Sequence, residues 1–201
     1  MMRIIAGTAR RKQLATLPGE DITRPTTERV KEGIFSAIQF EIEGRRVLDL
    51  FAGTGQMALE ALSRGAAYAV LIDQSTEAFE IIKKNAQTTE LNKNCRISRM
   101  DYSDYLKAAA LKEEKFDLIF LDPPYAKDVK DEVLKKVTRA GILNPGCIVV
   151  CESDKDLFAD GEEAYGLTFR RKYRYGKTFV TMLEAPGEED DIESILKGDN
   201  A

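Results

Sequence analysis

Histidine and tryptophan do not occur among the 201 residues, and there are only three cysteines. Without histidine, the chain has no side chain whose ordinary pKa suits acid–base work near pH 7, and it lacks a common nitrogen ligand of zinc. The cysteines, Cys95, Cys147 and Cys151, form no C-x-x-C pair and are odd in number. We therefore expect reduced, buried thiols, no disulfide and no bound metal.

Long hydrophobic runs are also missing. No apolar stretch approaches the roughly 20 residues that a membrane helix needs, and Met1-Met2-Arg3 leads straight into a strand-like segment without a signal-peptide pattern. We expect a soluble, cytoplasmic, monomeric protein with no membrane partner. A length of 201 residues with 43% hydrophobic side chains indicates one α/β core. A core of that size buries roughly 70% of the surface that the unfolded chain exposes.

Charge is distributed unevenly along the chain. Of the net charge of −4, the last sixteen residues carry −5, because six acids stand there against Lys197 alone, so residues 1–185 carry +1. Pro186-Gly187 ends the strand patterning, and a segment so rich in acids favours contact with water. We expect residues 186–201 to form a disordered acidic tail.

Strand and helix patterns alternate along the rest of the chain. After a hairpin over 3–6 and 12–16 and a helix over 26–42, the expected strands are 47–50, 69–72, 95–98, 118–121 and 148–151, and the expected helices are 56–64, 76–88, 104–111 and 129–140. A final hairpin pairs 167–174 with 178–184. The alternation predicts a Rossmann-like α/β fold, a doubly wound and mostly parallel sheet. Residues 1–44 would be an N-terminal hairpin and helix extension, and residues 45–185 the main domain.

A glycine turn follows the first core strand. Gly53 and Gly55 allow a tight turn and a close approach of backbone to ligand, and Asp73 closes the next strand, where an acid can accept both hydroxyls of a ribose. With Ala58, the glycines also fit the dinucleotide pattern G-x-G-x-x-G/A, so a nicotinamide cofactor is an alternative. Asp49 argues against it, because a carboxylate repels a pyrophosphate but suits the ammonium and sulfonium charges of S-adenosylmethionine.

The tetrapeptide Asp122-Pro123-Pro124-Tyr125 ends the apolar run over 116–121. Each proline fixes φ and donates no backbone hydrogen bond, so this loop is stiff and its carbonyls are free. An amino group on a planar base could donate one hydrogen to Asp122 and another to a carbonyl of the Pro-Pro step, while Tyr125 stacks on the ring. The motif predicts chemistry on the exocyclic amine of a nucleobase. The alternative is a rigid turn with an exposed acid and a packing tyrosine.

Glycine turn and Asp-Pro-Pro-Tyr alone indicate an amino-methyltransferase, and further segments make the pattern more specific. The chain resembles the RsmD family of small-subunit (16S) rRNA guanine-N2 methyltransferases over about residues 2–185, through segments 3–7, 24–32, 49–55, 60–66, 122–125 and 175–178. The resemblance implies methyl transfer from S-adenosylmethionine to the exocyclic amine of a guanine in small-subunit rRNA, either naked or in a partly assembled particle. Gln56-Met57 and Lys177 depart from the family pattern.

On this interpretation the site residues divide by role. Contacts with the cofactor are expected from Asp49, Phe51, Gly53, Gly55, Asp73, Asp101 and Tyr102. Of these, Asp73 would hold the ribose, and Asp101 with Tyr102 the adenine edge. The flipped base would be held by the catalytic loop, Asp122, Pro123, Pro124 and Tyr125.

Two basic clusters flank the main domain. Arg10, Arg11 and Lys12 stand together near the start. Near the end stand Arg170, Arg171, Lys172, Arg174 and Lys177, interleaved with Phe169, Tyr173 and Tyr175. Cations for phosphates and aromatic rings for bases predict an RNA surface, to which we assign the hairpin of residues 1–44 as a docking element. Arg24 joins this set, in a segment, 24–27, expected to close over the cofactor. For each cluster the alternative is a solvated face.

Two other functions remain open at this stage. A methyltransferase for adenine in DNA or another RNA would use the same Asp-Pro-Pro-Tyr loop. A nucleotide-binding oxidoreductase, or a cofactor-bound scaffold without catalysis, would use the same glycine turn.

Overall fold

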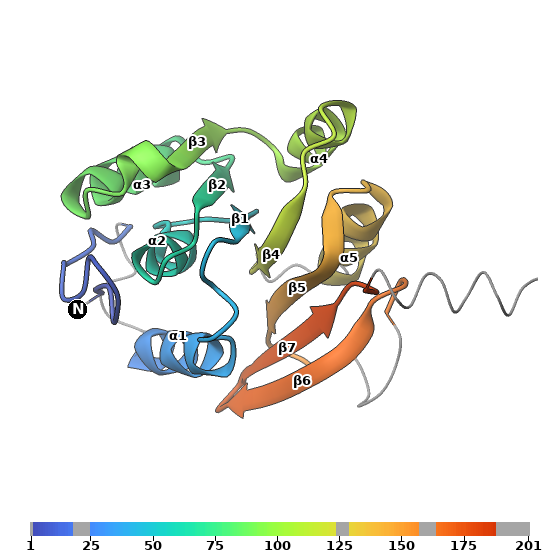
Figure 1. Cartoon of the computed structure of the whole chain (residues 1–201). Helices are drawn as coiled ribbons and strands as arrows, with labels where there is room; N and C mark the ends of the chain where they lie inside the picture. The colour runs from blue at the N-terminus through green and yellow to red at the C-terminus, as the bar shows by residue number, and fades with distance from the viewer. Residues whose placement is uncertain (1, 18–24, 124–128, 157–163, 188–201) are drawn as a thin grey trace, which may run out of the picture.

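A computed structural model describes residues 2–17, 25–123, 129–156 and 164–187 (Figure 1). Arg24, Pro124, Tyr125 and the tail from residue 188 onward, all named above, lie outside the described residues. Among the residues described, no helix is long and apolar enough to cross a membrane.

The expected alternation of strands and helices is confirmed. The helices are α1 (Pro25–Ala37), α2 (Gln56–Ser63), α3 (Thr76–Thr88), α4 (Tyr102–Leu111) and α5 (Val129–Arg139), with a short 3-10 turn, η1 (Asn92–Asn94). The strands are β1 (Arg46–Asp49), β2 (Tyr68–Asp73), β3 (Cys95–Arg99), β4 (Phe116–Leu121), β5 (Leu143–Ser153), β6 (Thr168–Tyr175) and β7 (Thr178–Glu184).

All seven strands form one sheet in the order β3-β2-β1-β4-β5-β7-β6 (Figure 1). Strands β1 to β5 run parallel to one another. Strand β7 lies between β5 and β6 and is antiparallel to both. Since β2 and β4 both flank β1, the order of strands reverses at β1, the switch point where ligands bind in open α/β sheets. The Rossmann-like, doubly wound fold predicted from the sequence is confirmed.

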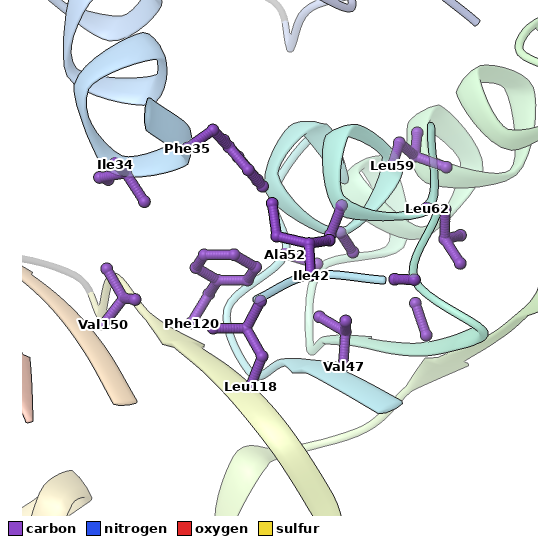
Figure 2. Close-up of a cluster of buried hydrophobic side chains, with 14 of the residues drawn as sticks. Ile34, Phe35, Ile42, Val47, Ala52, Leu59, Leu62, Leu118, Phe120 and Val150 are labelled. Carbon is purple, nitrogen blue, oxygen red and sulfur yellow. The ribbon is translucent and has the colours of Figure 1, made fainter. Parts of the chain in front are cut away.

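Alternate residues of each strand enter two separate cores, one on either face of the sheet. Val47 of β1 packs with α1, α2 and α3, whereas its neighbour Leu48 packs with α4 and α5. In the first core the rings of Phe35 in α1 and Phe120 in β4 lie 5.7 Å apart (Figure 2). The runs of apolar residues in the central strands therefore reflect burial on both faces.

Residues 2–17 pack into the first core. Ile4, Ala9 and Leu14 are buried there together with residues of α1 and α2. The contact is close, since a Cβ added to Gly7 would lie 1.7 Å from the carbonyl oxygen of Ser63, the last residue of α2. The N-terminal segment is thus built into the same core as the main sheet.

A buried carboxylate fixes this segment. Glu60 in α2 is fully buried and accepts hydrogen bonds from the backbone N–H groups of Ile5, at 2.7 Å, and Ala6, at 3.0 Å. Arg64 Nε donates to it at 2.8 Å, and the buried Lys31 Nζ of α1 lies 3.6 Å away. Lys31 also donates to the carbonyl of Arg3 at 2.6 Å. One side chain therefore joins the N-terminal segment, α1 and α2.

Lys31 keeps this arrangement only because its charge is paired. Burial lowers the pKa of Lys31 below its ordinary value, and the neighbouring Glu60 acts in the opposite direction. A buried ammonium group without a partner would be costly, so the ion pair and the bond to the Arg3 carbonyl are needed together.

Several expected boundaries were wrong. Strand β5 spans Leu143–Ser153 rather than 148–151. The hairpin over 3–6 and 12–16 is shorter than expected. A bridge pairs Arg3 with Gln13 and the N–H of Ile4 donates to the Lys12 carbonyl, but the N–H groups of Ile5 and Ala6 donate to Glu60. Helix α1 ends at Ala37 rather than 42, where the N–H of Glu41 donates to the Ile38 carbonyl in a tight turn. Helix α4 begins at Tyr102 rather than 104, because the Asp101 side chain caps it.

Replacing Glu60 by alanine should destabilise the protein by about 3–5 kcal/mol, since it leaves Lys31 buried and unpaired and removes the acceptor of two backbone N–H groups. The matched control is Glu80→Ala, because Glu80 also pairs with a helical lysine, Lys83 at 3.3 Å, but is exposed. The control should change the free energy of unfolding by no more than about 0.5 kcal/mol. Urea unfolding monitored by circular dichroism measures both, and equal losses would contradict the role given to Glu60.

Candidate active site

Four carboxylates lie at the carboxyl edge of the sheet. Asp49 and Asp73 are the last residues of β1 and β2, while Asp101 and Asp122 follow β3 and β4. Because β1 stands between β2 and β4, Asp49 occupies the middle position at the switch point. The sequence prediction that these acids share one edge is thus borne out by the strand order.

The glycine turn connects β1 to α2 as expected. Gly53 and Gly55 have φ values of 53° and 76°, which favour glycine. The two positions differ in their surroundings: a Cβ on Gly55 would lie 3.0 Å from Leu71 Cδ2, whereas one on Gly53 would meet no atom within 4 Å. Gly55 therefore packs α2 against the sheet, and Gly53 presents bare backbone to open space.

Asp73 shapes this turn. One of its carboxylate oxygens accepts the N–H of Gly53 and the other accepts the N–H of Ser75, both at 2.9 Å. Each oxygen keeps a further lone pair, so the carboxylate can still accept hydroxyl groups from a ligand. Asp73 thus holds the turn in place and also offers an acceptor beside it.

Asp49 is buried and has an unusual protonation equilibrium. Its Oδ2 accepts one hydrogen bond, from the N–H of Ala58 at 3.3 Å. Burial raises the pKa of Asp49 to about 7, the Ala58 bond opposes the rise, and the nearby charges of Asp122 and Asp73 add to it. A cationic group placed beside Asp49 would relieve this cost, because it would favour the ionised carboxylate.

Aromatic side chains line the next part of the edge. The rings of Phe51 and Tyr102 lie 5.2 Å apart, and Lys136 Nζ lies 5.1 Å from the centre of the Tyr102 ring. Asp101 accepts the N–H of Ser103 at 2.8 Å and so fixes the start of α4. Of the residues predicted for the adenine edge, Asp101 therefore has a capping role as well.

The catalytic loop is described only at its beginning. Asp122 is exposed directly after β4, and Pro123 is buried. Pro124 and Tyr125 lie outside the described residues. In the strand order β2-β1-β4, the Asp122 carboxylate therefore lies on one side of Asp49 and Asp73 lies on the other.

The predicted RNA-binding cations differ in their surroundings. Arg10 and Arg11 are exposed, whereas Lys12 pairs with Glu90 at 2.6 Å. In β6, Arg170 pairs with Glu41 at 2.7 Å, and Lys172 pairs with Asp156. Arg171 is exposed, and its guanidinium donates to the Tyr173 hydroxyl at 3.1 Å.

Sequence reasoning missed Asn85, a buried residue of α3. Its Oδ1 accepts the N–H of Ala15 at 2.7 Å, and its Nδ2 donates to the carbonyls of Ala15, at 3.0 Å, and Thr54, at 2.9 Å. Thr54 lies between the two glycines, so Asn85 supports the turn from behind. A signal was present in the sequence, because Asn85 falls on the apolar face of the helix with Ala78, Ile82 and Ala86.

The residues on the cofactor side fit S-adenosylmethionine. Open space lies before Gly53, Asp49 can pair with an ammonium group, and Asp73 has acceptor capacity for ribose hydroxyls. Gln56 adds a buried Oε1 that has no donor among the described residues. Within that same part of the chain, no cluster of three or more His, Cys, Asp or Glu residues could hold a metal ion.

Changing Asp49 to asparagine should stabilise the ligand-free protein, increasingly so as the pH rises. The pKa of Asp49 in the folded protein, about 7, is above the ordinary aspartate value of 3.8, so the wild-type protein loses stability as the pH rises from about 4 to 7. The free energy gained by the variant should therefore be small near pH 4, grow up to about pH 7 and level off above it.

Urea unfolding at several pH values measures this difference, with the exposed acid of Asp104→Asn as the control. A gain that is independent of pH would show that Asp49 has the same pKa in the folded and unfolded protein, and would contradict the effect of burial.

Comparisons with known proteins agree with this geometry. The family described as conserved hypothetical protein 95 matches residues 2–184. The Bacillus subtilis protein YlbH is 37% identical over 92% of this chain and 100% of its own length. Ribosomal RNA small subunit methyltransferase D of Haemophilus influenzae is 32% identical over 77% of this chain and 80% of its own length.

Solved structures share the fold. The Escherichia coli protein yhhF superposes with a TM-score of 0.79 at 28% identity, over 93% of this chain and 99% of that one. The Thermus thermophilus 16S rRNA N2 guanine methyltransferase RsmC, in complex with AdoMet and guanosine, superposes with a TM-score of 0.65 at 21% identity, over 84% of this chain and 45% of that one. The chain therefore belongs to the family described as conserved hypothetical protein 95, the RsmD family of rRNA methyltransferases.

Proposed function

We propose that this protein transfers a methyl group from S-adenosylmethionine to the exocyclic N2 amine of a guanine in small-subunit rRNA. The observation that carries the proposal is the row of Asp73, Asp49 and Asp122 at the ends of three adjacent strands, beside the open backbone of Gly53. The substrate class is supported by the relatives, among them ribosomal RNA small subunit methyltransferase D of Haemophilus influenzae.

The cofactor side is formed by residues of β1, β2 and the glycine turn. Asp49 pairs with the ammonium group of the methionine part, Gly53 and Gly55 let this part approach the backbone, and Asp73 accepts the ribose hydroxyls. Asp101, Tyr102 and Phe51 form the adenine end. When bound, S-adenosylmethionine supplies a methyl group already activated on a sulfonium.

The base side is formed by the catalytic loop, 122–125. Asp122 accepts one hydrogen of the guanine amine and thereby orients the nitrogen lone pair toward the cofactor side. Most of the rate enhancement then comes from alignment, since no further activation of the methyl group is needed. Asp122 is exposed, so a proton received from the amine can pass on to water.

The substrate is rRNA in its cellular setting. We propose a partly assembled small ribosomal particle in the cytoplasm, met by a monomeric enzyme. The two basic clusters identified from the sequence are the proposed RNA contacts. Three of the predicted RNA contacts, Arg10, Arg11 and Arg171, are exposed and form no ion pair with an acid among the described residues.

Removing either polar side chain of the catalytic loop should slow catalysis strongly without affecting cofactor binding. Asp122→Ala and Tyr125→Ala are each expected to lower kcat/KM for rRNA by about 10², or roughly 3 kcal/mol of transition-state stabilisation. Methyl transfer from labelled cofactor to unmodified rRNA, followed by nucleoside analysis, measures this and separates N2-methylguanosine from methylated adenosine. Asp104→Ala, an exposed acid of α4, is the control. Normal turnover in both loop variants would refute the assignment.

Asp73→Ala should weaken binding of S-adenosylhomocysteine. The variant loses charged acceptors worth roughly 1.5–3 kcal/mol each and also frees the N–H of Gly53 that shapes the turn. Isothermal titration calorimetry measures the Kd of S-adenosylhomocysteine for both proteins. A titration of the wild-type protein with NAD serves as the comparison, because a nicotinamide enzyme would prefer NAD. An unchanged Kd for Asp73→Ala would place the ribose elsewhere, and tight NAD binding by the wild-type protein would favour an oxidoreductase.

A further inference from the structure

We propose that the tip of the β6–β7 hairpin is a second RNA contact, which binds the single strand flanking the target guanine through Arg174 and Lys177. The inference rests on the proposed function, because it takes the base site at Asp122 as its starting point. We refer to residues 173–178 as the hairpin tip.

Strand register places the hairpin tip level with the catalytic loop. Leu121 of β4 pairs with Cys151, Cys151 with Thr181, and Thr181 with Lys172 of β6. The next residue of β4, Asp122, is therefore level with Tyr173, and the tip extends further in the same direction.

The distance between β4 and β6 across the sheet suits a short stretch of RNA. Three strand spacings separate β4 from β6, which is about 14 Å at about 4.8 Å each. This span equals about four stacked nucleotides at a rise of about 3.4 Å, and fewer where the strand is extended. A strand whose guanine enters the site at Asp122 can thus reach the tip without a duplex partner.

The hairpin tip carries cations available for phosphates. Arg174 and Lys177 are exposed, and neither forms an ion pair with an acid among the described residues. Arg174 is also held in place: its Nε donates to the Gly176 carbonyl at 3.1 Å, and its guanidinium carbon lies 5.2 Å from the centre of the Phe179 ring. An ordered guanidinium loses less entropy when it binds a phosphate than a free one.

Two cations nearer the start of β6, Arg170 and Lys172, are neutralised within the protein. Arg170 lies 2.7 Å from Glu41 and 3.6 Å from Glu184, and Lys172 pairs with Asp156. These cations would have to break ion pairs before they could bind phosphate. Arg171 forms no ion pair with the described acids, so together with Arg174 and Lys177 the unpaired positive charge extends from the middle of β6 to the tip.

The hairpin tip is braced against α1 (Figure 1). A Cβ added to Gly33 of α1 would lie 1.8 Å from the hydroxyl of Tyr175, so this hydroxyl occupies the space that only a glycine leaves free. The Tyr173 and Tyr175 rings stack at 6.3 Å between centroids. Since the tip is fixed relative to the first core, its distance from Asp122 is set by the fold.

The test compares two charge-matched double variants of the full chain. Arg174→Ala/Lys177→Ala removes the tip cations, whereas Arg139→Ala/Lys83→Ala removes one arginine and one lysine from helices α5 and α3. Circular dichroism and the Kd of S-adenosylhomocysteine should be unchanged in both. The probes are single-stranded RNA oligonucleotides that contain one guanine, with either the 5′ or the 3′ flank lengthened from zero to six nucleotides in separate series.

For the wild-type protein, affinity should rise as one of the two flanks lengthens to about four nucleotides and then level off. The tip variant should lose this gain, and the slope of log Kd against log salt for the long probe should fall by roughly 1.4, about 0.7 for each lost phosphate contact on a single strand. The control variant should behave as the wild-type protein does.

Retention of the flank-dependent gain and the full salt slope by the tip variant would overturn the inference, and so would a wild-type affinity that does not depend on either flank. Failure of the proposed function has a different signature: the wild-type protein would transfer no methyl group to small-subunit rRNA, whatever the result with the oligonucleotides.

Discussion

The architecture around the site depends on the buried carboxylate of Glu60, through its ion pair with Lys31 and its hydrogen bonds from the N-terminal segment. Glu60 lies in α2, the helix that starts directly after the glycine turn. Its carboxylate accepts hydrogen bonds from two backbone N–H groups of the N-terminal segment. An apolar residue at this position would leave those N–H groups without an acceptor, and a neutral amide could not balance Lys31. A charge is therefore required here, although burying a charge is unfavourable by itself.

The same polar contacts bind the N-terminal segment to the cofactor side. Asn85 contacts both Ala15 and Thr54, and the Thr54 hydroxyl donates to the Met2 sulfur at 3.3 Å. Met2 and Ala15, which precede the first core strand in the sequence, thus help to hold the glycine turn in place. The division of the chain into residues 1–44 and 45–185 describes its order in sequence, whereas in space the two parts share a single core.

Periodicity was sufficient to predict most of the fold. The range 76–88 expected for α3 matches the structure, because a capping serine and a regular apolar face mark its ends and its orientation. The acids at the strand ends were also predictable, since parallel strands present their carboxyl ends together. The pairing of Arg170 with Glu41 was not, because 129 residues separate them and no local pattern links the two. The length of the N-terminal hairpin was overestimated for the same reason: the N–H groups of Ile5 and Ala6 donate to Glu60, in a helix more than fifty residues away.

The strand order also has a consequence for synthesis of the protein on the ribosome. The Glu60 contacts, the glycine turn and Asp73 all lie within the first 73 residues, whereas β1 must wait for β4, about seventy residues later, to gain its second neighbour. Short loops close at a lower entropic cost than long ones, and domains emerge from the N-terminus first. The proposed cofactor side of the site can therefore begin to assemble on the nascent chain before the residues proposed to receive the base have left the ribosome.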